Sequence, residues 1–123
     1  MYQIIFYQDK NGKSEVLDYM EKLRSKRNNK DARVKINKIT AYINQLEKHG
    51  LSIGEPYIKH LDSDIWELRP LRDRILFAYW DNNKFILLSQ FIKRTQKTPQ
   101  REIEKAKRLL DDYKRGRSDK FEK

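Results

Sequence analysis

Residues 65–77 read IWELRPLRDRILF, and residues 85–101 read FILLSQFIKRTQKTPQR. Both stretches are dense in the Trp, Ile, Leu and Phe side chains that favour β-strands. Residues 65–101 also carry eight Lys or Arg against three acids, a net charge of +5, which is half of the +10 of the chain. Because guanidinium and ammonium groups on a formed sheet are suited to phosphate, this stretch predicts a strand-rich, phosphate-binding surface.

The length of the chain, 123 residues, predicts a single domain over residues 1–123 with one modest core. A net charge of +10 favours a polyanionic partner: nucleic acid, an acidic protein or an anionic membrane surface. The alternative is that the charge serves only solubility. Its clustering in one stretch favours a functional contact with a polyanion.

The sequence contains no cysteine, which is compatible with a reducing compartment. No apolar run approaches the ~20 residues that a membrane-spanning helix needs. The first residues show no basic segment followed by an apolar run, so no signal peptide is predicted. These features predict a cytoplasmic protein with no membrane partner.

The first half of the chain predicts one strand and two helices. Residues 2–7 are mostly apolar, which favours a strand inside a sheet rather than at its edge. Residues 9–12 form a turn signal, and a helix is expected from Ser14 to about residue 25. A second helix is expected from a cap at Asn29 or Asp31 to Gly50. The apolar faces of the two helices are formed by Val16, Leu17, Met20 and Leu23, and by Ile36, Ile39, Ile43 and Leu46.

The second half predicts four strands and a helix. Strands are expected at residues 57–61, 65–69, 74–80 and 85–94, with a hairpin turn at 81–83. Thr98 is expected to cap the last helix and Pro99 to occupy its first position. The apolar face of that helix is formed by Ile103, Ala106, Leu110 and Tyr113. Residues 114–123 are expected to be a frayed basic tail. The order β-α-α-β-β-β-β-α predicts an α+β domain with a twisted antiparallel sheet, in which the first strand pairs at long range.

Residues 66–77, WELRPLRDRILF, and residues 87–99, LLSQFIKRTQKTP, together resemble the phage-derived, HigB-like (Gp49-like) branch of the RelE/ParE toxin superfamily. The pattern of that branch is an ELR segment, an arginine on the next strand, and then LLHGF-x-KK-TQKTP before the last helix. The TQKTP segment matches completely. Ser89 and Gln90 replace the frequent His and Gly, and Arg94 replaces the second Lys of the KK pair.

This resemblance implies a RelE-like fold and the toxin of a type II toxin–antitoxin system. It implies a ribosome-dependent, metal-independent mRNA endoribonuclease that inhibits translation and uses no cofactor. The implied partner is a helix-turn-helix, HigA-like antitoxin. ParE-type relatives share the fold but poison DNA gyrase by binding alone, and a fold does not decide between these activities. A plain nucleic-acid-binding module is the third interpretation.

The chemistry of metal-free RNA cleavage needs a proton acceptor for the 2′-hydroxyl, cations for the developing charge and a proton donor for the leaving oxygen. Arg69, Arg74 and Lys93 match the motif and are the candidate catalytic cations. Glu67 shares a strand face with Arg69, so it is expected to orient Arg69 or to act as the base. Further cations are predicted to bind RNA or the ribosome: Arg72, Arg94, Lys97, Arg101 and Lys59.

Each of these residues also has a purely structural interpretation. Arg69 is equally well explained by a surface salt bridge to Glu67 or Asp73. Lys93 and Arg94 would also serve to protect an edge strand from aggregation. No metal site is predicted, because the chain has no Cys and its two His are distant from each other in the sequence.

Overall fold

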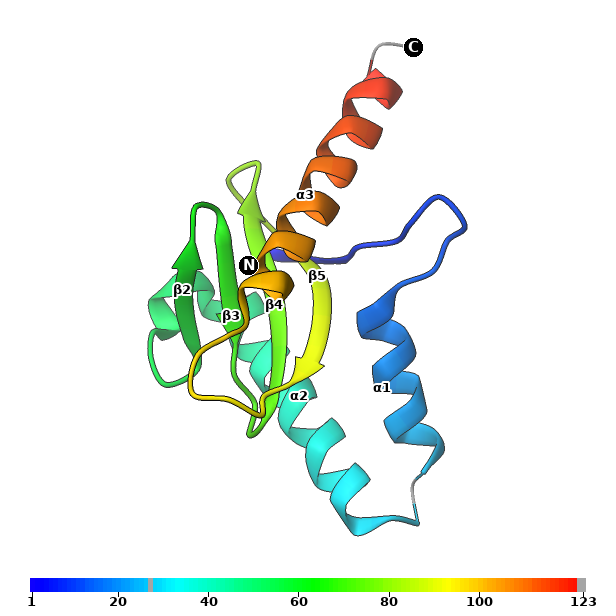
Figure 1. The fold of residues 1–123 in the computed structure, drawn as a ribbon, viewed down its shortest axis with the longest axis vertical. Coiled ribbons are helices and arrows are strands. Elements are labelled where there is room, and N and C mark those ends of the chain that lie inside the picture. Colours follow the sequence, from blue (N-terminus) through cyan, green and yellow to red (C-terminus); the bar gives the residue numbers. More distant parts are fainter. Residues whose placement is uncertain (27, 122–123) are drawn as a thin grey trace.

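The strand-rich part of the chain forms a five-stranded sheet in the order β1-β5-β4-β3-β2, with helices on both faces (Figure 1). This computed structural model describes the backbone of residues 1–26 and 28–121 and the side chains of residues 1–26 and 28–116. The elements are β1 (Gln3–Phe6), α1 (Glu15–Ser25), α2 (Lys30–His49), the 3-10 helix η1 (Gly50–Ile53), β2 (Ile58–Asp62), β3 (Ile65–Leu68), β4 (Asp73–Trp80), β5 (Lys84–Ile92) and α3 (Gln100–Phe121). The predicted α+β class and element order are confirmed.

Strands β2 to β5 form the expected antiparallel meander, whereas β1 pairs in parallel with β5. The prediction that residues 2–7 lie inside the sheet is wrong, because β1 is an edge strand. Its apolar composition has another cause: Ile4 and Phe6 pack into the core on one face of the sheet, and Ile5 packs on the other. This pairing places β5 in the interior of the sheet.

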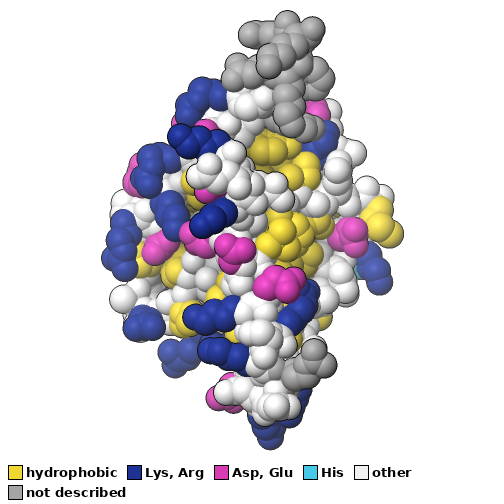
Figure 2. Space-filling model, turned by 90° about the vertical axis from the view of Figure 1, so that its right-hand side faces the viewer, with side chains coloured by type: hydrophobic (Ala, Val, Ile, Leu, Met, Phe, Trp, Pro, Cys, Tyr) yellow, Lys and Arg dark blue, Asp and Glu magenta, His cyan; other side chains and the backbone are white. Residues whose placement is uncertain are grey.

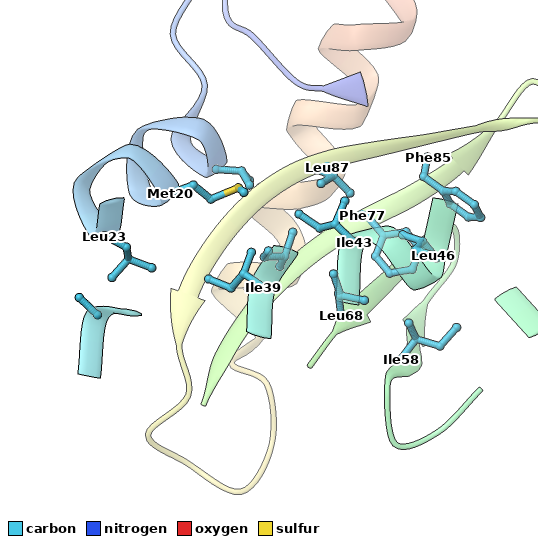
Figure 3. Close-up of a cluster of buried hydrophobic side chains, with 13 residues drawn as sticks. Met20, Leu23, Ile39, Ile43, Leu46, Ile58, Leu68, Phe77, Phe85 and Leu87 are labelled. Atoms are coloured by element: carbon cyan, nitrogen blue, oxygen red, sulfur yellow. The ribbon is translucent and has the colours of Figure 1, made fainter. Parts of the chain in front are cut away.

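Helices α1 and α2 cover one face of the sheet. The Ser14 hydroxyl caps α1 by accepting from the Leu17 amide at 3.2 Å. The side-chain oxygen of Asn29, Oδ1, caps α2 by accepting from the Ala32 amide at 3.0 Å. Of the two predicted caps of α2, Asn29 is therefore the one used. The main core lies between these helices and the sheet (Figure 3) and is formed mainly by Met20, Leu23, Ile39, Ile43, Leu46, Ile58, Leu68, Phe77, Phe85 and Leu87.

Helix α3 covers the opposite face, where a second cluster contains Ala106, Leu110, Ile65, Leu76, Ala78, Ile86 and Leu88. The helix begins at Gln100, and the Pro99 carbonyl accepts from the amides of Glu102 (3.0 Å) and Ile103 (3.4 Å). Pro99 therefore precedes the first residue of the helix, whereas the sequence predicted that it occupies that position. The Thr98 hydroxyl, predicted to cap the helix, donates instead to the Glu67 carboxylate.

The predicted frayed tail, residues 114–123, falls mostly outside the described side chains. Helix α3 continues past residue 114 to Phe121, and the Lys114 ammonium lies 4.8 Å from the centre of the Trp80 ring. In the part of the chain that the structure describes, no helix combines the length and hydropathy of a membrane span.

Gly50 tests how α2 is joined to the rest of the fold. Its φ of 63° and ψ of −151° form a combination that is nearly exclusive to glycine, and a Cβ atom there would lie 2.6 Å from the Tyr2 ring. We expect Gly50→Ala to lower the free energy of unfolding by about 1–3 kcal/mol, measured by urea denaturation. Gly116→Ala is the matched control, since a Cβ meets nothing within 4 Å there; in a helix it should gain about 0.5–1 kcal/mol. Equal midpoints for Gly50→Ala and the parent chain would contradict this account.

Candidate active site

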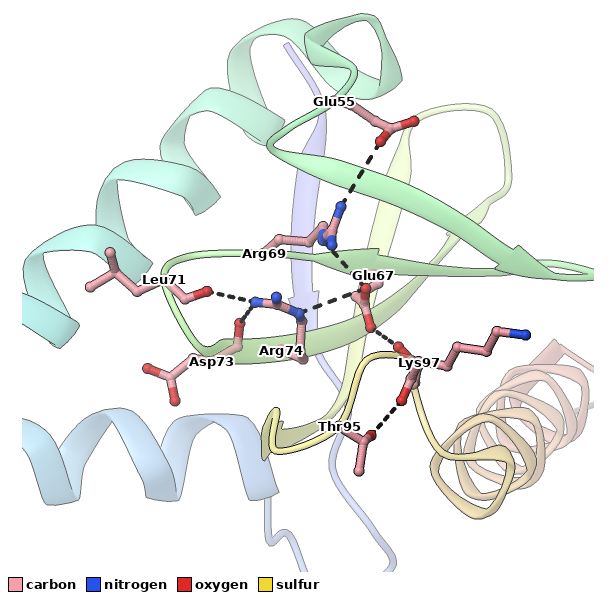
Figure 4. A network of polar contacts seen from close by, with 9 residues as sticks. Glu55, Glu67, Arg69, Leu71, Asp73, Arg74, Thr95 and Lys97 are labelled. Carbon is pink, nitrogen blue, oxygen red and sulfur yellow. Dashed lines mark hydrogen bonds and ion pairs between the residues drawn. The ribbon is translucent and has the colours of Figure 1, made fainter.

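Glu67 lies at the centre of a polar network beside the loop that joins β5 to α3 (Figure 4). It is 1% exposed and pairs across the sheet with Leu76, which places it on the face covered by α3. One carboxylate oxygen lies 3.5 Å from Arg69 Nε and 3.7 Å from Arg74 Nε, and the other accepts from the Thr98 hydroxyl. A buried carboxylate is tolerated only with such partners, so the contacts fix both arginines and the loop.

Arg69 follows directly after β3 and makes the predicted contact with Glu67. Its side chain is 22% exposed and also lies 3.9 Å from the carboxylate of Glu55, which is 73% exposed. The Arg69 amide donates to the Tyr57 carbonyl at 2.9 Å. Arg69 is therefore held at its backbone and its Nε while part of its guanidinium faces solvent.

Arg74 is almost buried, at 7% exposure, near the start of β4. Its Nη1 donates to the carbonyls of Leu71 (2.7 Å) and Asp73 (2.9 Å). Leu71 has a φ of 59°, a left-handed conformation that is costly for a leucine and that marks a locally strained turn. Burial lowers the pKa of the Arg74 guanidinium, and the charge of Glu67 opposes that shift.

Lys93 follows the last residue of β5 and is half-buried. Burial lowers the pKa of its ammonium group, and the charges of Arg74 and Arg69 lower it further, whereas Glu67 raises it and Lys59 lowers it. Arg74, Arg69, Glu67 and Lys59 therefore each lie within electrostatic reach of Lys93. Lys59 reaches the same sheet face because it pairs with Glu67 across β2 and β3. The convergence that the sequence left open is present in the structure.

An open groove of about 560 Å³ passes beside this cluster and is lined by Arg72, Arg74, Lys93, Arg94, Thr95 and Gln96. Four of the six lining residues are cations and none is an acid, so the groove is suited to an anionic chain. The Lys93 amide donates to the Arg72 carbonyl at 2.8 Å, which closes the strand end beneath the groove. Strand β1 pairs only with residues 84–87 of β5, so the end of β5 at Lys93 and Arg94 lies beyond that pairing, and protection of a strand edge stays an alternative explanation for these two cations.

Two of the predicted RNA-binding residues lie apart from this cluster. Lys97 is exposed, and Figure 4 shows its side chain directed away from Arg74. Arg101 is exposed in the first turn of α3. Over residues 1–26 and 28–116, no ion pair or hydrogen bond joins either side chain to Glu67, Arg69, Arg74 or Lys93.

Ser89 occupies the position at which the resembling toxins often have histidine. It is fully buried, and it pairs with Leu76 on the face that α3 covers. Its hydroxyl has no hydrogen-bond partner in the described part of the chain. An imidazole would add volume at a fully buried position, which costs packing energy, so we do not expect Ser89→His to raise activity.

The sequence interpretation missed the residues that hold the network together. Thr98 lies 31 positions from Glu67, and local pattern predicts only a helix cap at this residue. Glu55 comes from the loop before β2, and its contact with Arg69 carries no local sequence signal. Thr95 and Gln96 line the groove. Both belong to the TQKTP segment that carries the family resemblance, so the sequence contained a signal that could have identified them as site residues. In the described ranges, no group of three or more His, Asp or Glu is placed to hold a metal ion.

The model of the family described as Phage derived protein Gp49-like (DUF891) matches residues 28–111 of this chain. No curated protein matches the sequence significantly. Among solved structures, the chain is similar to the YoeB-YefM complex from Staphylococcus aureus, with 16% sequence identity and a TM-score of 0.49. That alignment covers 76% of this chain and 99% of the other.

Glu67→Gln tests the central carboxylate. Removing one partner of a buried ion pair leaves the other charges uncompensated, so we expect the free energy of unfolding to fall by on the order of 3 kcal/mol. Glu55→Gln is the matched control, since its carboxylate is 73% exposed and faces the same arginine; its effect should stay below about 1 kcal/mol. Urea denaturation measures both. Similar small losses in the two variants would show that Glu67 is not the anchor of this network.

Proposed function

The chain belongs to the phage-derived Gp49-like family, and we propose that it is the toxin of a type II toxin–antitoxin system that cleaves mRNA on the ribosome without a metal. Two observations support this proposal: the motif at residues 66–99 and the groove lined by four cations. The observation that carries it is the cluster of Arg69, Arg74 and Lys93 around a buried carboxylate, beside that groove. Such a cluster supplies fixed positive charge at a site large enough for an RNA backbone.

In the proposed reaction the 2′-hydroxyl oxygen attacks the neighbouring phosphorus. The O2′–P bond forms, the P–O5′ bond breaks, and the products are a 2′,3′-cyclic phosphate and a free 5′-hydroxyl. Arg69 and Arg74 stabilise the charge that develops on the phosphoryl oxygens. Lys93 donates the proton that the leaving O5′ needs, because its lowered pKa makes it a better acid than an ordinary lysine.

Glu67 acts in this proposal by orienting the two arginines rather than as the base. Its carboxylate is 1% exposed and already engaged by Arg69, Arg74 and Thr98, so a substrate hydroxyl would have to displace one of these contacts. The 2′-hydroxyl proton therefore passes to water in the open groove.

The proposed partner in the inactive state is a helix-turn-helix, HigA-like antitoxin, as the motif resemblance implies. An acidic segment of such a protein would complement the cations of the groove. Co-expression followed by pull-down tests for the complex. The site of action would be the cytoplasm, where the ribosomes are.

Lys93→Ala tests the catalytic proposal. Removing a cation that acts only in the transition state should slow mRNA cleavage by on the order of 10²–10³-fold and relieve growth inhibition. Thermal stability should hardly change, because Lys93 follows β5 and is half-exposed. The readout is cleavage of a translated message, followed by primer extension. Lys97→Ala is the matched control: it removes the same charge from a side chain that points away from Arg74. Toxicity with intact transcripts and DNA-damage signalling would instead favour a gyrase poison.

The pH dependence of cleavage tests Lys93 as the proton donor. A donor loses its proton as the pH rises through its pKa, and the pKa of Lys93 is lowered, so the rate should fall on the alkaline side. Lys93→Arg keeps the positive charge but titrates at higher pH. Its alkaline limb should therefore move upward in single-turnover measurements, although its maximal rate should be lower. Identical alkaline limbs in the two proteins would exclude Lys93 as the titrating group.

A further inference from the structure

The excess positive charge of this chain lies in two segments. Residues 65–101, which contain the groove, carry +5. Residues 21–38 carry eight Lys or Arg against two acids, a net charge of +6. The rest of the chain contains 12 Lys or Arg and 13 acids, a net charge of −1. The second basic segment is therefore at least as charged as the first, and the proposed reaction does not use it.

Residues 21–38 span the end of α1, the connection to α2 and the first half of α2. We call their exposed cations the hairpin tip: Lys22, Arg24, Lys26, Lys30, Arg33 and Lys38. Figure 2 shows Lys and Arg side chains over much of this face of the molecule, its lower end included. The four lysines among them, Lys22, Lys26, Lys30 and Lys38, are exposed to solvent, so their charge is available to a partner.

The charge of the hairpin tip is compensated only in part within the fold: Arg24 lies 3.3 Å from the Glu21 carboxylate, and Lys22 and Arg24 lie in the last turn of α1, where the helix dipole favours cations. Lys30 and Arg33 lie in the first turn of α2, where the helix dipole disfavours cations, and Asp31 is the acid of that turn. On α3, by contrast, Lys105 pairs with Glu15 at 2.5 Å and Lys107 pairs with Asp62 at 2.6 Å.

Four cations of the hairpin tip form no ion pair with any acid in the described ranges: Lys22, Lys26, Lys30 and Lys38. Folding alone does not require this concentration of like charge, which destabilises a compact state by self-repulsion.

The hairpin tip is attached to the groove through α1. The Tyr19 hydroxyl donates to the Asp73 carboxylate at 2.6 Å, and Asp73 stands between the groove residues Arg72 and Arg74. Lys22 follows Tyr19 by about one turn of the same helix, and Lys26 is the residue that caps the end of that helix. Figure 1 shows the α1–α2 connection, the β3–β4 turn and the loop after β5 at the same end of the long axis. An extended polyanion at that end can contact both surfaces.

We propose that the hairpin tip is a second RNA-binding surface, which binds the phosphate backbone of folded ribosomal RNA while the groove holds the message. The inference rests on the proposed function and names the surface by which the ribosome is recognised. Protein partners bind through buried aromatic and apolar anchors, whereas phosphates need only cations. Among the described residues of 21–38, Val34, at 45% exposure, is the one large hydrophobic residue that is exposed, so the hairpin tip offers few apolar anchors. The chemistry of the hairpin tip therefore favours RNA over an antitoxin.

The test compares two full-length variants that lose the same charge. The tip variant carries Lys22→Gln, Lys26→Gln, Lys30→Gln and Lys38→Gln. The control variant carries Lys10→Gln, Lys13→Gln, Lys48→Gln and Arg108→Gln, which are exposed cations outside both basic segments. Binding to purified ribosomes is measured over a series of salt concentrations, with a 2′-O-methylated message that cannot be cleaved. Binding of a short single-stranded 2′-O-methyl oligoribonucleotide is measured in parallel.

We expect the tip variant to lose ribosome affinity by on the order of 10- to 100-fold and its salt slope to fall by about two to four. The control variant should change little in either quantity. The short oligoribonucleotide should bind both variants like the parent chain, because it fills only the groove.

Equal ribosome binding by the two variants would overturn the inference. Loss of antitoxin binding with normal ribosome binding would also overturn it, since the hairpin tip would then be a protein interface. The proposed function fails separately: a parent chain that leaves transcripts intact but binds ribosomes through the hairpin tip retains the RNA surface and loses only the nuclease assignment.

Discussion

The buried carboxylate of Glu67 is the contact on which the candidate site depends. It bridges three segments that are far apart in the chain: the end of β3, the start of β4 and the loop before α3. A carboxylate this deeply buried is stable only while its cationic and hydroxyl partners remain in place. The same pairing offsets the electrostatic repulsion between the guanidiniums of Arg69 and Arg74, of which Arg74 lines the groove. The contacts of Glu67 therefore serve both the stability of the fold and the proposed catalysis, so a substitution of Glu67 is expected to lower both.

The two faces of the sheet have different roles: one carries the main apolar core, and the other carries the polar residues of the candidate site. The face under α1 and α2 carries the larger apolar cluster. The face under α3 carries a smaller cluster, which gives way to Glu67, Arg74 and Lys59 toward the groove. Polar residues can be concentrated there because the other face secures the strands. The groove lies where α3 has not yet begun to cover the sheet, beside the loop after β5.

Local patterns in the sequence predicted the five strands and the first two α-helices to within a few residues, because apolar periodicity and caps such as Ser14 and Asn29 act over short distances. The 3-10 helix η1 was not predicted, and α3 extends to Phe121, beyond the expected start of a frayed tail at residue 114. Properties set by long-range pairing were not predictable. The edge position of β1 follows from its parallel pairing with β5, 81 residues away in the pair Gln3 and Lys84. The Glu67–Arg69 contact was predictable from strand alternation, whereas Thr98 reaches Glu67 only because of the path of a loop. Burial of Ser89 depends on the position of α3, which no local pattern specifies.

The parallel pairing of β1 with β5 also orders events during synthesis. The first strand to leave the ribosome can join the sheet only after residues 84–87 have been made. The groove is lined by residues 93–96, and the Glu67 carboxylate accepts from Thr98. A nascent chain that ends before Thr98 therefore cannot contain the assembled site. Contacts of such high sequence separation are entropically costly to form early, which delays closure of the sheet until most of the chain is available. The topology thus keeps the candidate site absent until translation has passed Thr98.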